Sequence, residues 1–243
     1  MKILQSFLAA LAASAVTLAA QANCIPQVVD GSVFTLKGNT SVPGPTFNYT
    51  VPGGVTNTLL VVHLDQGSGG SLPSAITYGG VGLADLWTCS KCTSVRDANG
   101  GLQSIWYLVA PPAGLHTLAL TTNGNSVPFN VEVETITGAN QSSPFGAVAN
   151  NYDASYNTQY TTNLSTFHTN GLAVDFLSFG SGDSPNVSLR NGQTEIYYLQ
   201  ANPAASLQSV TPAFVPTTYS QFYTFQWPDV YASMSAEVVS WCD

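Results

Sequence analysis

Charged side chains are scarce in this chain of 243 residues, and basic ones are the scarcest. Charged residues make up 7% of the sequence, with five Lys and Arg against thirteen Asp and Glu and a formal net charge of −8. Nucleic-acid binding depends on clustered Lys and Arg that neutralise phosphates, so we predict no nucleic-acid partner. The same deficit disfavours attraction to an anionic membrane surface.

Long apolar runs are missing beyond the first twenty residues. Lys2 is followed by an apolar stretch, Ile3 to Ala20, which ends in the small-residue triplet Ala20-Gln21-Ala22. A signal peptidase recognises this order, so we expect a signal peptide over residues 1–22 and a secreted, extracellular mature protein. No later stretch is apolar for long enough to span a bilayer, and we predict no membrane insertion.

Apolar residues at helical spacing are also absent after the signal peptide, and period-two alternation takes their place. Phe47, Tyr49 and Val51 alternate with Asn48 and Thr50, as in a strand with one buried face. Gly, Pro and Asn interrupt the pattern at intervals typical of sandwiches and barrels. We predict an all-β fold, a two-sheet antiparallel β-sandwich of jelly-roll type with about a dozen strands, in one domain over residues 23–243.

The expected strands follow this alternation and the turn residues between them. They cover residues 47–51, 59–64, 75–78, 81–87, 104–109, 115–120, 129–137, 160–164, 172–179, 195–199, 219–225 and 234–241.

Several strand-and-turn segments resemble a jelly-roll module found in secreted and surface proteins of microbes and in phage structural proteins. These segments are Leu59–Val62, Ile76–Leu83, Ser104–Leu108, Pro111–Thr117, Ile136–Ala139, Ser143–Gly146 and Leu172–Asp175. The resemblance covers residues 45–180 and implies a β-sandwich similar to concanavalin-like and carbohydrate-binding folds. It implies no reaction, because none of these segments is a catalytic motif.

The four cysteines are an even number in a chain that we expect to be exported, which favours disulfides. We predict the pairs Cys24–Cys242, joining the two ends of the mature chain, and Cys89–Cys92, closing a tight turn. A redox motif and half of a zinc site are the alternatives for Cys89 and Cys92. The redox alternative lacks a βαβ context, and zinc would need two further ligands that the sequence does not place.

His63 and Asp65 are candidates for acid–base chemistry, because residues two apart on one strand share a face and a carboxylate can orient a histidine base. Ser184 follows them in chain order, but no serine-hydrolase motif surrounds it and no G-x-S-x-G elbow occurs. We favour a strand histidine held by local hydrogen bonds at His63, and a packed residue at His116.

Glu132 and Glu134 form a second candidate pair on one strand, opposite Val131 and Val133. Glycosidases place their paired carboxyl groups on different strands, about 5–10 Å apart, so we favour a solvated outer face for both. Calcium binding and catalysis are the alternatives. We therefore predict no cofactor and no metal site, with structural calcium as the alternative.

Aromatic residues gather in the second half of the chain, next to Asn, Ser and Thr. Flat rings beside amides and hydroxyls suit sugars, whose C–H faces stack while their hydroxyls hydrogen-bond. On alternating strands, about half of such rings belong to the core instead. The candidate ligand-binding residues are Tyr152, Tyr156, Tyr197, Tyr219, Tyr223 and Trp227.

We expect a secreted protein that binds carbohydrate or cell-surface material without catalysis. A polysaccharide hydrolase or lyase is the first alternative and requires acids from separate strands in one cleft. A structural subunit of a coat or filament is the second, and requires a free strand edge or arm. Five Asn-x-Ser/Thr sequons, a number close to chance, would make a glycoprotein only in a eukaryotic host. They lie at Asn39, Asn48, Asn140, Asn163 and Asn186.

Overall fold

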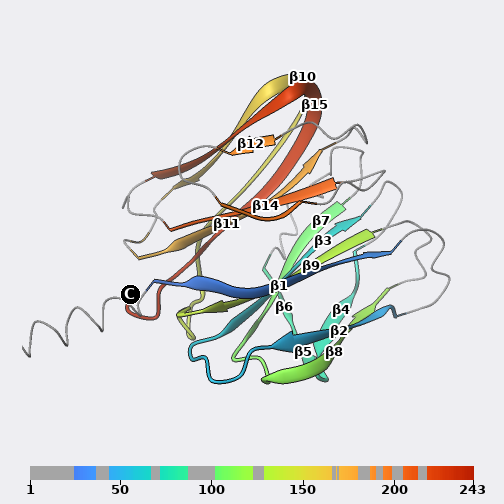
Figure 1. The fold of residues 1–243 in the computed structure, drawn as a ribbon, viewed down its shortest axis with the longest axis vertical. Helices are drawn as coiled ribbons and strands as arrows, with labels where there is room; N and C mark the ends of the chain where they lie inside the picture. The colour runs from blue at the N-terminus through green and yellow to red at the C-terminus, as the bar shows by residue number, and fades with distance from the viewer. Residues whose placement is uncertain are drawn as a thin grey trace, which may run out of the picture.

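The computed structural model describes residues 25–36, 44–66, 72–86, 102–122, 129–165, 168, 170–179, 187–189, 194–198, 205–212 and 218–243. In these ranges all regular structure is β-strand, arranged in three antiparallel sheets (Figure 1). The predicted all-β antiparallel sandwich is confirmed, and the structure adds a third sheet to the two that were expected. Among these residues no helix could span a membrane.

The strands of the first two sheets precede those of the third along the chain. The first two sheets contain β1 (Gln27–Leu36), β2 (Thr46–Val51), β3 (Leu59–Gln66), β4 (Ala75–Tyr78), β5 (Val81–Gly82), β6 (Ala84–Asp85), β7 (Leu102–Val109), β8 (Gly114–Thr121) and β9 (Phe129–Thr137). The third contains β10 (Phe145–Ser165), β11 (Leu172–Phe179), β12 (Val187–Leu189), β13 (Thr194–Tyr198), β14 (Ala205–Pro212) and β15 (Thr218–Val238).

The first two sheets have jelly-roll topology. Sheet A has the order β1-β9-β3-β7-β6, and sheet B has the order β2-β8-β4-β5. Apart from the two-residue β6, the strands follow the jelly-roll order, in which the first strand, β1, pairs with the last, β9, and the second, β2, pairs with the last but one, β8. This topology confirms the jelly-roll interpretation of the sequence.

Sheet A is covered on both faces, which explains the continuous apolar run of β3. Leu60, Val62 and Leu64 pack against sheet B, in a cluster with Tyr49, Ile76, Leu118 and other buried residues. Leu59 and Val61 point to the opposite face. A strand that is buried on both sides carries apolar residues at successive positions and not at alternate ones.

The C-terminal sheet, with the order β10-β15-β11-β14-β13 and β12 paired with β15, packs on that opposite face of sheet A. Its side chains Phe176 and Met234 share one hydrophobic cluster with Leu59, Val61 and Ile136 of sheet A. The three sheets therefore stack as layers, with sheet A in the middle (Figure 1).

The long strands β10 and β15 bend back over their own sheet, as Figure 1 shows at the top of the molecule. Their pairing register shifts between Asp153 and Asn157, where the bend occurs. Across the bend, Asn151 Nδ2 donates to Thr161 O at 3.0 Å, and Leu164 of the outer half packs with Ala173 of β11 in a small apolar cluster. The outer halves of these strands thus cover the face of the C-terminal sheet that points away from sheet A.

One predicted strand, 81–87, is two strands in the structure. β5 belongs to sheet B, whereas β6 pairs with β7 in sheet A. Buried Leu83 marks the position where the chain crosses between the sheets. The alternation pattern in the sequence did not indicate β1, β12, β14 or the first half of β10.

Tyr78 links three segments of the jelly-roll core through its buried hydroxyl. The Oη atom lies 2.9 Å from Gly114 O and 3.2 Å from Tyr49 O, and it accepts from Val51 N at 3.2 Å. Burial raises the pKa of this phenol, which keeps the hydroxyl protonated as a donor.

We predict that Tyr78→Phe lowers the free energy of unfolding by about 1–3 kcal/mol, because it leaves buried backbone groups without their partner. Urea unfolding of the two proteins measures this change. Equal midpoints would show that the hydroxyl contributes nothing to stability.

Candidate functional site

Polar side chains gather at the centre of sheet A, on the face that the C-terminal sheet covers. We call them the interior polar cluster, and each is 3% exposed or less: His63, Asp65, Gln103, Glu132 and Glu134. His63 Nδ1 lies 3.2 Å from Glu132 Oε2, and the imidazole stacks on Phe176 of β11 at a centroid distance of 4.4 Å. The structure therefore brings all four acid–base candidates of the sequence to one face.

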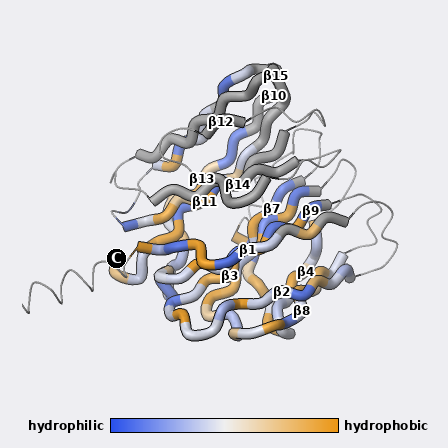
Figure 2. The backbone as a smooth tube through the Cα atoms, viewed as in Figure 1, coloured by the Kyte–Doolittle hydropathy of each residue, from blue (hydrophilic) through white to orange (hydrophobic). Residues whose placement is uncertain are grey.

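The strand register explains this grouping. His63 on β3 pairs with Glu132 on β9, and Asp65 pairs with Gln103 on β7. Glu134, two residues after Glu132 on β9, pairs with Val61 of β3. In Figure 2, blue stretches mark hydrophilic residues on strands of sheet A near the labels of β7 and β9.

Two expectations about these residues are wrong. Glu132 and Glu134 do not lie on a solvated face, since their exposures are 1% and 0%. The hydrogen bond of His63 is not local either, because Glu132 is 69 residues away in sequence. Alternation along β9 indicated a two-faced strand, but it could not show that a third sheet covers the polar face.

Glu134 is held in an unfavourable environment for a charge. Burial, and secondarily the Glu132 carboxylate, raise the pKa of Glu134 well above its ordinary value of 4.5. Among the described residues, neither carboxyl oxygen of Glu134 has a hydrogen-bond partner, and the same holds for His63 Nε2 and the Gln103 amide. Such buried polar atoms cost free energy, so the cluster is not explained by stability.

A second buried acid, Asp175, lies on the other face of the C-terminal sheet. Its neighbour across the β11–β15 ladder is Ser235, whose hydroxyl donates to Asp175 Oδ1. Nearby, the hydroxyls of Thr162 and Ser233 lie 2.5 Å apart under the folded-back half of β10. Burial raises the pKa of Asp175 to about 8, although the hydrogen bonds from Ser235 and the Phe176 backbone oppose this shift.

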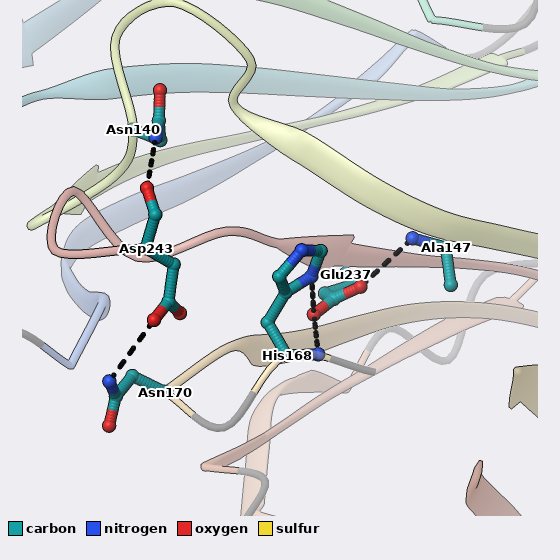
Figure 3. Close-up of polar contacts among 6 residues, drawn as sticks. All are labelled: Asn140, Ala147, His168, Asn170, Glu237 and Asp243. Carbon is teal, nitrogen blue, oxygen red and sulfur yellow. Dashed lines mark hydrogen bonds and ion pairs between the residues drawn. The ribbon is translucent and has the colours of Figure 1, made fainter. Parts of the chain in front are cut away.

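Glu237 on β15 forms a third buried acidic site, which the sequence analysis missed (Figure 3). Its carboxylate accepts from His168 N at 2.5 Å, from His168 Nδ1 at 2.9 Å and from Ala147 N at 2.9 Å. A Cβ atom at Gly146 would overlap this carboxylate, so the approach requires glycine there. The His168 side chain is 47% exposed, which leaves its other ring edge toward solvent.

An open pocket of about 370 Å³ lies where sheet A meets the end of the chain. Its lining includes Gln27 of β1, Thr56 and Asn57 before β3, Thr137 at the end of β9, Gly138 after it, and Trp241. Trp241 is 44% exposed, and its backbone N donates to Gly138 O at 3.0 Å. The pocket therefore combines an accessible indole with amide and hydroxyl groups, and among the residues that the structure describes its lining contains no acidic or basic side chain.

Gly138 allows the two ends of the described chain to meet at this pocket. Its φ of +76° lies in the left-handed region, and a Cβ atom there would come within 3.2 Å of Ile25 O. Ile25 and Trp241 therefore both lie against Gly138. The alternation pattern placed Trp241 in the last expected strand, 234–241, whereas β15 ends at Val238 and Trp241 lies in a turn. The adjacent Cys242 is the local signal that this tryptophan lies at a special position.

The predicted aromatic ligand residues lie away from this pocket in the strand order. Tyr152 and Tyr156 are on β10, Tyr197 is on β13, and three others are on β15: Tyr219, Tyr223 and Trp227. Their side chains lie outside the described part of the structure, so a role in binding stays a prediction.

Cys242 is disulfide-bonded. Cys24, Cys89 and Cys92 lie outside the described residues, as does Ser184. Within the described residues, no three His, Cys, Asp or Glu side chains are arranged to hold a metal ion. His116 is half-buried, and its ring packs edge-on against Tyr78 at a centroid distance of 5.4 Å.

Three of the five sequons lie on described residues. Asn48 and Asn163 are exposed. The Asn140 side chain instead accepts from Ser142 N and Ser143 N and donates to Asp243 O at the end of the chain (Figure 3).

Comparison with protein-family models and with curated proteins finds no match for this chain. Among solved structures, the chain is similar to one titled "Crystal structure of Cucumber Necrosis Virus", with a TM-score of 0.28 and 8% identity over 86% of this chain and 96% of that chain. The chain is also similar to a structure titled "Red Clover Necrotic Mosaic Virus", with a TM-score of 0.24 and 10% identity over 88% of this chain and 93% of that chain. For an anti-sigma factor domain-containing protein, the TM-score is 0.22 and the identity is 10% over 90% of each chain.

These TM-scores are all below 0.5, so nothing about the site rests on them. The jelly-roll assignment rests on the strand order, and the concanavalin-like part of the resemblance stays a prediction.

We predict that stability falls as pH rises, in part because of Asp175. Its folded pKa is about 8, against an ordinary value of 3.8, so the folded state retains a proton that the unfolded state has lost between these pH values. The free energy of unfolding then decreases by about 1.4 kcal/mol per pH unit for this one proton. Asp175→Asn is expected to make the decline between pH 5 and pH 8 less steep.

Urea unfolding at pH 5 and pH 8 measures both slopes. Asp30→Asn on β1 removes the same charge from a half-buried position outside these sites and serves as the control. An identical slope in wild type and Asp175→Asn would contradict the prediction.

Proposed function

We propose that the protein is exported and binds an extracellular carbohydrate in the pocket beside Trp241. The observation that carries this proposal is the 44% exposed Trp241, which borders a pocket with amide and hydroxyl groups. An indole face stacks on the C–H face of a sugar ring, while amides and hydroxyls pair with the sugar hydroxyls. The volume of about 370 Å³ falls within the range of small-ligand sites.

The lining also favours a neutral sugar over an acidic one. Its polar side chains include Gln27, Thr56, Asn57 and Thr137, and none of the described lining residues has a charged side chain. A uronic acid or a sulfated sugar would need a cation to offset the cost of desolvating its own charge. Neutral polysaccharides are therefore the expected ligands.

A hydrolase is less favoured as the primary function. Its candidate acids, Glu132 and Glu134, lie beneath the C-terminal sheet with 1% and 0% exposure. A polysaccharide chain needs an open cleft in which two carboxyl groups flank the scissile bond. In the described part of the chain, the accessible pocket has no carboxyl side chain among its lining residues.

We expect Trp241→Ala to weaken retention on the polymers that bind wild-type protein by at least about tenfold, equivalent to about 1.4 kcal/mol. The measurement is a pull-down with insoluble cellulose, chitin and β-1,3-glucan, supplemented by an array of neutral oligosaccharides. Leu115→Ala is a matched control. Leu115 is 66% exposed on β8, so this substitution removes apolar surface away from the pocket.

Two results would count against this proposal. Absence of wild-type binding to every polymer and oligosaccharide would remove carbohydrate binding as the function. Binding that Trp241→Ala and Leu115→Ala leave equally strong would move the site away from the pocket.

Export and the disulfide pairing belong to the same proposal. Cys242 is disulfide-bonded, and the residue before it, Trp241, donates to Gly138. Ile25, the residue after Cys24, lies against the same glycine. This proximity supports Cys24 as the partner of Cys242, which would tie both ends of the mature chain beside the pocket.

Peptide mapping without reduction, by mass spectrometry on secreted protein, is expected to find Cys24 linked to Cys242 and an N-terminus near residue 23. Reduction is expected to lower the free energy of unfolding by about 2–5 kcal/mol. A peptide that links Cys242 to Cys89 or Cys92 would disprove the pairing.

A further inference from the structure

The face between sheet A and the C-terminal sheet is unlike an ordinary sandwich core. One part of it is apolar, with Leu59, Val61, Ile136 and Met234 in one cluster. The adjoining part holds the interior polar cluster, in which Glu134 is fully buried and has no hydrogen-bond partner for its carboxyl oxygens among the described residues. The two sheets therefore close over an acid that nothing in the described structure compensates.

The contrast with Glu237 shows that burial alone is not the difficulty. Both glutamates have 0% exposure. Glu237 accepts from two backbone N–H groups and from His168, which together replace the water that it has lost. Glu134 has no such donors among the described residues, so an ionised Glu134 would lose its hydration without replacement.

Within the described ranges, which contain no Lys or Arg, the titratable groups around Glu134 do not offset such a charge. On sheet A, the Glu132 carboxylate adds repulsion, and the His63 ring is hydrogen-bonded to Glu132. The other titratable groups on this face of sheet A are Asp65 and Tyr107. From the C-terminal sheet, Phe176 and Met234 face this layer, whereas Asp175 and Glu237 lie on the opposite face. Asp30 of β1 pairs with Thr135, whose side chain meets Tyr49 on the sheet B side.

We propose that the interface between sheet A and the C-terminal sheet is a proton-dependent closure, shut while Glu134 is protonated and loosened when Glu134 ionises. A neutral carboxyl can remain in the closed interface, whereas a carboxylate next to Glu132 favours hydration. Closure is therefore favoured in an acidic medium, and loosening at higher pH exposes the His63 face of the jelly roll. Backbone hydrogen bonds join the two layers beside the pocket, where Asn140 N donates to Val239 O and Trp241 N donates to Gly138 O. The ladders of the two sheets do not cross the interface, so the layers can loosen around Glu134 while the strands of each sheet stay paired.

Met234 is a built-in probe of this closure. It is one of two methionines in the chain, is 0% exposed, and lies in the cluster between the two sheets. Hydrogen peroxide converts an accessible thioether to the sulfoxide, which adds one oxygen to the peptide mass. Removal of residues 1–22 would leave Met234 as the one methionine of the mature protein, and peptide mapping also separates it from Met1 in unprocessed chain.

The experiment measures the rate of Met234 oxidation by hydrogen peroxide between pH 5 and pH 9. In wild type the rate is expected to rise by up to about tenfold per pH unit while Glu134 is mostly protonated, because the ionised fraction rises tenfold per unit. Glu134→Gln, which keeps a neutral side chain of similar shape, is expected to oxidise slowly at every pH. Asp175→Asn is the matched control and is expected to retain the wild-type pH dependence, because Asp175 lies on the other face of the sheet.

Three outcomes would overturn the proposal. The first is a wild-type rate that does not change with pH, which needs no variant to be observed. The second is a pH dependence that persists in Glu134→Gln. The third is loss of the β-sheet circular dichroism signal together with Met234 exposure, since this would mean that the whole chain unfolds instead of the interface loosening.

Discussion

The packing of sheet A between two other sheets is the constraint on which the rest of the structure depends. One face of β3 packs on sheet B through Leu60 and Val62, and the other packs on the C-terminal sheet through Leu59 and Val61. A middle layer has no solvated side, so every residue of its central strands must be accommodated in the interior. The burial of His63 and of its carboxylate neighbours follows directly from this arrangement.

Three buried acids show three solutions to the same electrostatic problem. Glu237 is surrounded by donors from the backbone and from His168. Asp175 has the hydroxyl of Ser235, and its pKa is raised to about 8. Glu134 has a carboxylate neighbour and no described donor, and its pKa is raised well above its ordinary value. Ionisable groups with strongly shifted pKa values cluster at functional sites, which gives the uncompensated Glu134 interest beyond stability.

The pocket depends on the same layered arrangement. Its walls come from sheet A, from the loop before β3 and from the segment after β15, which are far apart in sequence. The left-handed backbone of Gly138 brings Ile25 and Trp241 to one position. Because one wall follows the C-terminal sheet and the other belongs to sheet A, the relative position of these sheets also determines the shape of the pocket.

Local pattern was sufficient for the strands and for the shared faces, whereas three-dimensional packing decided which faces meet solvent. Alternation and turn residues placed most strands of the jelly roll, and the i, i+2 spacing correctly put His63 with Asp65 and Glu132 with Glu134 on common faces. Pairing of His63 with Glu132 across 69 residues depends on strand register, which no local pattern encodes. The burial of these acids could not be predicted because the sheet that covers them is formed by strands from Phe145 onward. Alternation along β9 is the same whether its polar face is solvated or covered by another sheet. The exposure of Trp241 was missed for the converse reason, since only the path of the chain around Gly138 turns it outward.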